Sequence, residues 1–171
     1  MSDTAPVIRI QGGSAHIVRD AWRLVRSAAE WDGSPDAVLP LELAMAQTER
    51  ARAAGRIGVW LGPKDSPACA AELFDVVSLI GVDFPKFTDG RGYSTAMLLR
   101  TRHGWRGELR AFGDVLQDQL FAMRRVGFDS FALRADRDPV AALGAFAPFS
   151  HVYQGSADEP LPLFRRTASC T

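Results

Sequence analysis

A regular alternation of short apolar runs and helical patterns between residues 57 and 153 most constrains the fold of this chain. Its clearest part reads as apolar run, turn, helix, strand, helix and strand at residues 79–87, 88–92, 93–102, 109–112, 114–126 and 128–133. Such alternation is typical of parallel strands that are joined by right-handed helical crossovers. We therefore expect an α/β fold with a mainly parallel sheet.

The full alternation contains about five strands, interleaved with helices. The strands are expected at residues 57–61, 76–84, 109–112, 128–133 and 149–153. Ser-Pro at residues 66–67 and Asp-Pro at residues 138–139 indicate helix starts, because each pairs a capping side chain with a proline in the first turn. Two arrangements fit the repeat length of βα units: a small doubly wound sheet, or a (β/α) barrel that is left open.

Three parts of the chain are distinguished by composition. Residues 1–34 form a weakly defined N-terminal segment, residues 35–155 the α/β domain, and residues 156–171 a proline-containing tail. Within the first part, residues 7–10 alternate like an edge strand, whereas residues 15–31 fit either a short helix or a hairpin. A helix at residues 41–54 is expected before the alternation begins, with Gly55 after its end.

Charge and cysteine content exclude several classes of protein. The 20 basic and 20 acidic residues cancel, which argues against general binding to nucleic acid or to anionic membranes. Cys69 and Cys170 are too few for a disulfide framework or a four-cysteine metal site. No run of residues is long and apolar enough to span a bilayer, and residues 1–10 lack the apolar stretch of a signal peptide. We expect a cytoplasmic protein.

The turn at residues 88–92 is the leading candidate for a binding site. Gly90 and Gly92 lie where a strand ends and a helix begins, which is where free backbone N–H groups favour an anion. Arg91 could add a bidentate charge contact, and Tyr93 and Ser94 follow it. The alternative is that the glycines only serve a tight turn, with Asp89 as a helix cap.

Further candidates come from the next βα unit. Asp114 and Gln117 have the spacing of a capping box, so Asp114 is expected to cap the following helix. Asp118 and Gln119 lie one turn later, either facing a cleft or on the surface. Arg91, Arg110 and their neighbouring arginines form either a solvated basic face, an anion site or a docking patch.

Motifs for metal binding, nucleophilic catalysis and cofactor binding are missing from the sequence. It contains no HExxH, GxSxG, CxxC or Walker pattern, and the GxG at residues 90–92 lacks the third glycine of a dinucleotide fingerprint. No cofactor is therefore indicated by motif. A flavin site without a fingerprint stays open.

Three segments together resemble a bacterial family of unknown function that is associated with assimilatory sulfite reduction. They read FPKFTDGRGYS from residue 84, GELRAFGDVLQDQL from residue 107 and MRRVGFDSF from residue 123. The motif positions are Phe84, Pro85, Phe87, Asp89, Gly90, Arg91, Gly92, Tyr93, Ser94, Gly107, Glu108, Leu109, Arg110, Gly113, Asp114, Asp118, Gln119 and Gly127. One departure is Val126, where members often carry cysteine.

The resemblance implies a function but transfers no catalytic residue. Members are commonly labelled oxidoreductases of sulfite reduction, yet redox catalysis needs a carrier, and the sequence shows no motif for one. We therefore expect an accessory protein that acts with sulfite reductase. The alternatives are a small oxidoreductase or binder of a small anion at residues 89–94, and a protein whose function lies on a partner surface. Homo-oligomerisation stays open.

Overall fold

The computed structural model describes residues 6–146 and 152–166, and all structural statements concern these residues. The strands are β1 (Pro6–Gln11), β2 (Ser14–Arg19), β3 (Arg23–Leu24), β4 (Ala37–Pro40), β5 (Ile57–Leu61), β6 (Val77–Phe84), β7 (Glu108–Gly113) and β8 (Ser130–Phe131). The α-helices are α1 (Leu41–Ala46), α2 (Thr48–Ala53), α3 (Pro67–Ala71), α4 (Arg91–Thr101), α5 (Leu120–Arg125), α6 (Pro139–Ala142) and α7 (Leu163–Arg166). Short 3₁₀ turns are η1 (Ala28–Glu30), η2 (Gln117–Gln119) and η3 (Leu143–Phe146).

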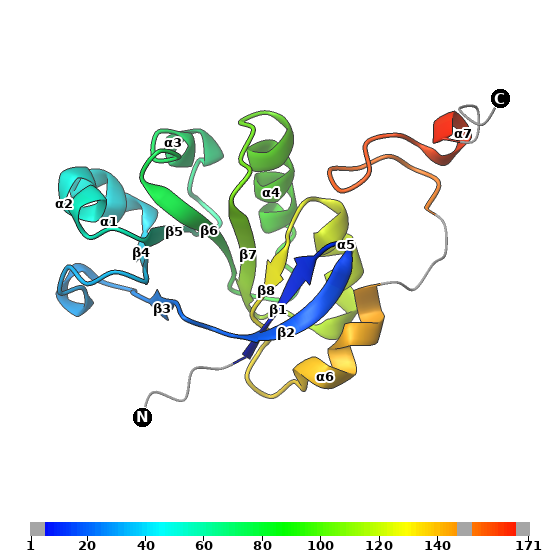
Figure 1. Cartoon of the computed structure of the whole chain (residues 1–171), viewed down its shortest axis with the longest axis horizontal. Coiled ribbons are helices and arrows are strands. Elements are labelled where there is room, and N and C mark those ends of the chain that lie inside the picture. The colour runs from blue at the N-terminus through cyan, green and yellow to red at the C-terminus, as the bar shows by residue number, and fades with distance from the viewer. Residues whose placement is uncertain (1–5, 147–151, 167–171) are drawn as a thin grey trace.

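The strands form one curled sheet in the order β2-β1-β8-β7-β6-β5-β4-β3. Strands β3 to β8 are parallel to one another and follow in sequence order, whereas β1 and β2 are antiparallel to their neighbours. The predicted mainly parallel α/β sheet is confirmed. The doubly wound alternative is wrong, because the strand order never reverses and the helices cover the outer side of the curl (Figure 1). The open partial barrel describes the sheet.

The prediction of about five strands is too low, because the described residues contain an eight-stranded sheet. Three of the additional strands, β1, β2 and β3, come from the first 34 residues, and β4 follows them directly. Strand β1 is not an edge strand, since it pairs with both β2 and β8. Residues 15–31 begin within β2, the second strand of the β1–β2 hairpin, so a hairpin and not a short helix starts this segment. The expected strand at residues 149–153 lies mostly outside the described residues.

The connection between β2 and β3 explains why the sheet is curled. These strands lie at opposite edges of the sheet, yet only residues 20–22 separate them along the chain. Four extended peptide steps reach about 14 Å at most. The two edges must therefore approach each other at this point, and residues 20–22 cross the concave face as a strap.

The main core lies between the convex face of the sheet and the helices. It includes alternate residues of β6 together with residues of α4: Ile80, Val82, Phe84, Ala96 and Leu99. Because strand side chains alternate between faces, Leu79 points to the concave side. There it packs with Trp22 of the strap and with Val38, in a separate apolar cluster. The sheet thus separates a large convex core from a smaller concave one.

Candidate functional site on the concave face

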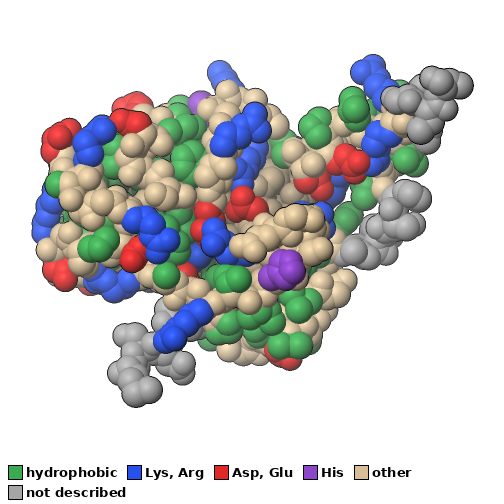
Figure 2. Space-filling view, viewed as in Figure 1, with side chains coloured by type: hydrophobic (Ala, Val, Ile, Leu, Met, Phe, Trp, Pro, Cys, Tyr) green, Lys and Arg blue, Asp and Glu red, His purple; other side chains and the backbone are tan. Residues whose placement is uncertain are grey.

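The concave face carries charged side chains where the interior of a (β/α) barrel is usually packed with branched apolar ones. Neighbouring residues of parallel strands point to the same side, and β6 and β7 pair as Leu79↔Glu108, Gly81↔Arg110 and Asp83↔Phe112. Glu108, Arg110 and Asp83 therefore share the concave face. Figure 2 shows acidic and basic side chains side by side in the middle of this view.

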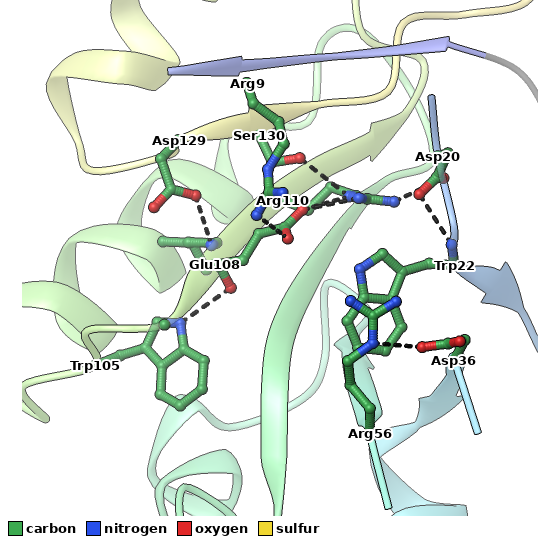
Figure 3. Close-up of polar contacts among 12 residues, drawn as sticks. Arg9, Asp20, Trp22, Asp36, Arg56, Trp105, Glu108, Arg110, Asp129 and Ser130 are labelled. Carbon is green, nitrogen blue, oxygen red and sulfur yellow. Dashed lines mark hydrogen bonds and ion pairs between the residues drawn. The ribbon is translucent and has the colours of Figure 1, made fainter. Parts of the chain in front are cut away.

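Arg110 is the centre of a buried ion-pair network (Figure 3). Its Nη1 donates to Asp20 Oδ2 at 2.8 Å, its Nη2 to Glu108 Oε1 at 2.8 Å, and its Nε to Ser130 Oγ at 3.1 Å. Arg9 donates to the other oxygen of Glu108 at 2.5 Å. Two guanidinium groups thus face two carboxylates. The network is electrically balanced, because two positive and two negative side chains take part in it.

The network fixes the strap. Asp20 binds Arg110 through Oδ2 and accepts the backbone N–H of Trp22 through Oδ1 at 3.1 Å. Trp22 is buried and fills the concave face. The space left between strap and sheet is a cavity of about 90 Å³ that Asp20, Trp22, Gly81, Arg110 and Phe112 help to line. Arg110 therefore has a structural role on the concave face, while it also lines this cavity.

Asp83 differs from this network because its carboxylate has no hydrogen-bond partner in the described part of the chain. It lies near the carboxyl end of β6, beside Phe112 in the register. The Phe112 ring meets Trp60 edge to face, with centroids 6.1 Å apart. Both aromatic side chains close over Gly81, where an added Cβ would lie 3.0 Å from Phe112 and 3.3 Å from Trp60. Asp83 therefore lies next to a pair of packed aromatic rings, those of Phe112 and Trp60.

The environment of Asp83 favours its neutral form. Burial raises the pKa of its carboxyl above the ordinary value, and the charge of Asp89 adds to this, whereas Arg26 opposes it. Gly113 leaves space for the carboxylate, because a Cβ there would lie 2.8 Å from Asp83 Oδ1 and 2.5 Å from the Phe84 carbonyl oxygen. The positive φ of 98° at Gly113 also suits glycine. A half-buried carboxyl of this kind can accept a proton or a hydrogen bond from a ligand.

The predicted turn lies on the same rim, at the carboxyl end of β6. Asp89 accepts the backbone N–H of Arg91 at 3.1 Å and binds its guanidinium through two further hydrogen bonds at 2.9 and 2.7 Å. This bidentate pair lowers the pKa of Asp89. Gly90 has an ordinary helical φ of −80°. Gly92 is buried, and a Cβ there would lie 2.5 Å from the Phe84 ring. Asp89 therefore accepts the first backbone N–H of α4 and pairs with Arg91, while Gly92 permits a close helix–strand contact.

The second loop of the rim does not have the predicted cap. Asp114 does not cap the following helix: its Oδ2 accepts the Phe87 N–H at 2.8 Å and its Oδ1 binds Arg134 at 2.8 Å. Gln119 performs the capping, because its Oε1 accepts the Leu116 N–H at 3.0 Å. Its Nε2 also donates to the Phe87 carbonyl at 3.2 Å. Asp114 and Gln119 thus tie the β6–α4 loop to the β7–η2 loop.

The remaining predicted residues complete the rim. Tyr93 is half-buried, and its pKa is raised first by burial and then by the charge of Asp118. Asp118 and Ser94 are exposed. The structure therefore gathers the predicted residues at the ends of β6 and β7, except Arg110, which lies within the concave face.

Sequence reasoning missed the residues of the concave face that are most unusual. These are Arg9, Asp20, Asp83 and Ser130, and also Glu108, which the resemblance named as a motif position but not as a site residue. One signal was available for Asp83: it shares a strand face with Leu79 and Gly81, so a charge ends an otherwise apolar stripe. The partners of Arg110 come from strands far apart in sequence, and no local pattern indicates them.

Two general features of the described residues bear on cofactors and membranes. No group of three or more His, Cys, Asp or Glu side chains is arranged to hold a metal ion there. None of the helices described has the length and apolar character needed to cross a membrane.

Comparison with known proteins gave one match. A family described as a bacterial protein of unknown function (DUF934) matches residues 58–164, which include most of β5, all of β6 to β8 and both rim loops. The searches among curated proteins and among solved structures returned no match.

Proposed function

The chain belongs to the DUF934 family of bacterial proteins of unknown function, and on this premise we propose that it is an accessory protein of assimilatory sulfite reduction. In this role it acts with sulfite reductase and is not a complete enzyme. The support is the resemblance of the segments at residues 84–94, 107–120 and 123–131 to a family associated with that pathway.

One structural observation favours the rim as the working part of this protein. Residues of the first two resembling segments form the loops after β6 and β7, which Asp114 and Gln119 join through Phe87. Asp83, whose carboxylate has no hydrogen-bond partner among the described residues, lies close to these loops at the carboxyl end of β6. Ligands of open parallel sheets bind at the carboxyl ends of strands, which is where this rim lies. We infer that the rim binds a small ligand with a hydrogen-bond donor for Asp83.

A growth experiment tests the accessory role. A deletion strain is expected to grow poorly on sulfate and normally on sulfide, because only the first source requires sulfite reduction. The wild-type gene should restore growth, whereas Asp83→Asn should not. Normal growth of the deletion strain on sulfate would contradict the proposal, and full complementation by Asp83→Asn would remove Asp83 from it.

A second candidate is a binder of a small anion at residues 89–94, or a small oxidoreductase that holds such an anionic cofactor. The observation that favours it is the exposure of Arg91, whose side chain is 59% accessible despite its pair with Asp89. An anion would have to displace the Asp89 carboxylate. Arg91→Ala should then weaken binding of sulfite or flavin mononucleotide at least tenfold, or about 1.4 kcal/mol. Unchanged binding would reject this site.

Two spectra of the natively purified protein test whether it binds a cofactor. An absorbance spectrum and a native mass spectrum are expected to show a colourless protein of bare-chain mass if the accessory role holds. A coloured preparation with a non-covalent adduct would favour the oxidoreductase.

A further inference from the structure

A second cavity lies at the amino-terminal end of the parallel strands, where β7 and β8 begin. It has a volume of about 400 Å³, within the range of small-molecule sites. Residues just before β7 and β8 line it, together with the last turns of α4 and α5 and residues 157–158 of the C-terminal segment. This cavity is separate from the rim of the concave face.

The C-terminal segment is held in place as one wall of this cavity. The Arg125 carbonyl accepts the Ala157 N–H at 3.0 Å and the Ser156 hydroxyl at 2.6 Å. The Arg125 guanidinium binds Asp158 at 2.8 Å and also the Gln154 carbonyl. The wall therefore rests on several contacts with the end of α5.

The charges that line the cavity do not cancel. Arg100 is engaged, since it donates to Asp129 at 2.7 Å and to the carbonyls of residues 105, 107 and 127. Asp158 is likewise paired with Arg125. Among the described residues, Arg124 by contrast donates only to two neutral carbonyl oxygens, at 3.2 and 3.4 Å.

Arg106 is the second cation without a carboxylate. It is exposed at the cavity and makes no hydrogen bond or ion pair within the described residues. Figure 2 shows Lys and Arg side chains gathered over α4 and the connection that follows it, which contains Arg106. Two guanidinium groups therefore line one cavity with no acidic partner.

We propose that this cavity binds a small organic anion, of the phosphate-monoester class, whose charged group pairs with Arg106 and Arg124. Guanidinium groups match the geometry of phosphate oxygens and bind them bidentately. The apolar lining by Ile10, Phe128 and Ala157 suits the organic part of such a ligand. This site is independent of the proposed role of the rim.

Calorimetric titration of the full chain tests the site, with AMP, inorganic phosphate and adenosine as probes. Wild-type protein should bind AMP saturably, phosphate more weakly and adenosine not at all. Arg106→Gln should weaken AMP binding at least tenfold. The matched control is Arg102→Gln, because Arg102 is exposed nearby but does not line the cavity, and it should leave binding unchanged.

Four outcomes would overturn the proposal. The first is no saturable binding of AMP or phosphate. The second is an equal loss of AMP binding in Arg106→Gln and in the control Arg102→Gln, which indicates a diffuse basic surface. The third is equal affinity for AMP and phosphate, which removes the organic part of the ligand. The fourth is binding of adenosine as tight as that of AMP. Arg124→Gln should also weaken binding tenfold, and its melting curve shows whether the fold is kept.

Discussion

At the scale of single residues, the concave face contains two kinds of charge with different physical roles. Arg110 is buried and fully matched by Asp20 and Glu108, so it stabilises one arrangement of strap and sheet. Asp83 is half-buried and unmatched, which is unfavourable for folding and is typical of groups kept for binding or proton exchange. The sequence marked Arg110 as a candidate ligand residue and passed over Asp83, because only the tertiary partners distinguish them.

Removing the charge of Arg110 should destabilise the protein strongly. Arg110→Met keeps much of the side-chain volume but leaves Asp20 and Glu108 facing each other with only Arg9 to compensate. We expect a loss of about 3–5 kcal/mol in the free energy of unfolding, measured in urea. The control Arg102→Met, at an exposed position, should stay within about 0.5 kcal/mol. A loss under about 1 kcal/mol for Arg110→Met would contradict the structural role.

Replacing Asp83 should have the opposite effect on stability. Its pKa is raised in the folded state, so its contribution is most favourable below the unfolded pKa of about 3.9 and is lost as pH rises through the folded pKa. Asp83→Asn should therefore raise the melting temperature at pH 7, and the gain should shrink as pH falls toward about 4.

Melting curves from pH 3.5 to pH 8 check this prediction, and Asp75→Asn serves as control. Asp75 is exposed, and its hydrogen bond with Arg52 lowers the pKa of its carboxyl. Its replacement should not stabilise the protein at pH 7. A lower melting temperature for Asp83→Asn at pH 7 would show that Asp83 stabilises the fold after all.

At the scale of elements, strands with continuous apolar runs and helices with strong caps could be predicted from sequence. Strand β5 was predicted with its observed bounds, and the caps at Ser66 and Asp138 are confirmed, with side chains that accept the N–H two residues on. Strands β3 and β4 were missed because they are short and take their stability from pairing in the curled sheet. The cap assigned to Asp114 was wrong because its carboxylate is used by Phe87 and Arg134.

The two glycines of the α4 turn allow a matched test of what that turn is for. Gly92→Ala places a Cβ against the Phe84 ring, so we expect a loss of about 1–3 kcal/mol in unfolding free energy from overpacking. Gly90 has helical φ and no neighbour within 4 Å, so Gly90→Ala should be neutral or stabilising by up to about 1 kcal/mol. Urea unfolding of both variants decides. Equal destabilisation by both would indicate that the backbone of the whole turn needs glycine.

At the scale of the whole molecule, the strap explains why the sheet is an open barrel and not a doubly wound sheet, a choice that the alternation of strands and helices left open. Repeat length fits both a doubly wound sheet and an open barrel, but three residues between opposite edges permit only a strongly curled sheet. The strap, Trp22 and the Arg110 network occupy the middle of the concave face. The rim lies beyond this filled region, and both loops of the resembling segments meet there near Asp83.

Affinity capture of sulfite reductase tests the central claim most directly. Tagged wild-type protein, purified from cells growing on sulfate, should retain sulfite reductase at low ionic strength. Asp83→Asn, which removes the half-buried carboxylate of the rim, should lose it, whereas Arg102→Gln should not. The melting temperature of each variant is measured in parallel, so that loss of fold is recognised. Failure of folded wild-type protein to capture the reductase would contradict the proposed role.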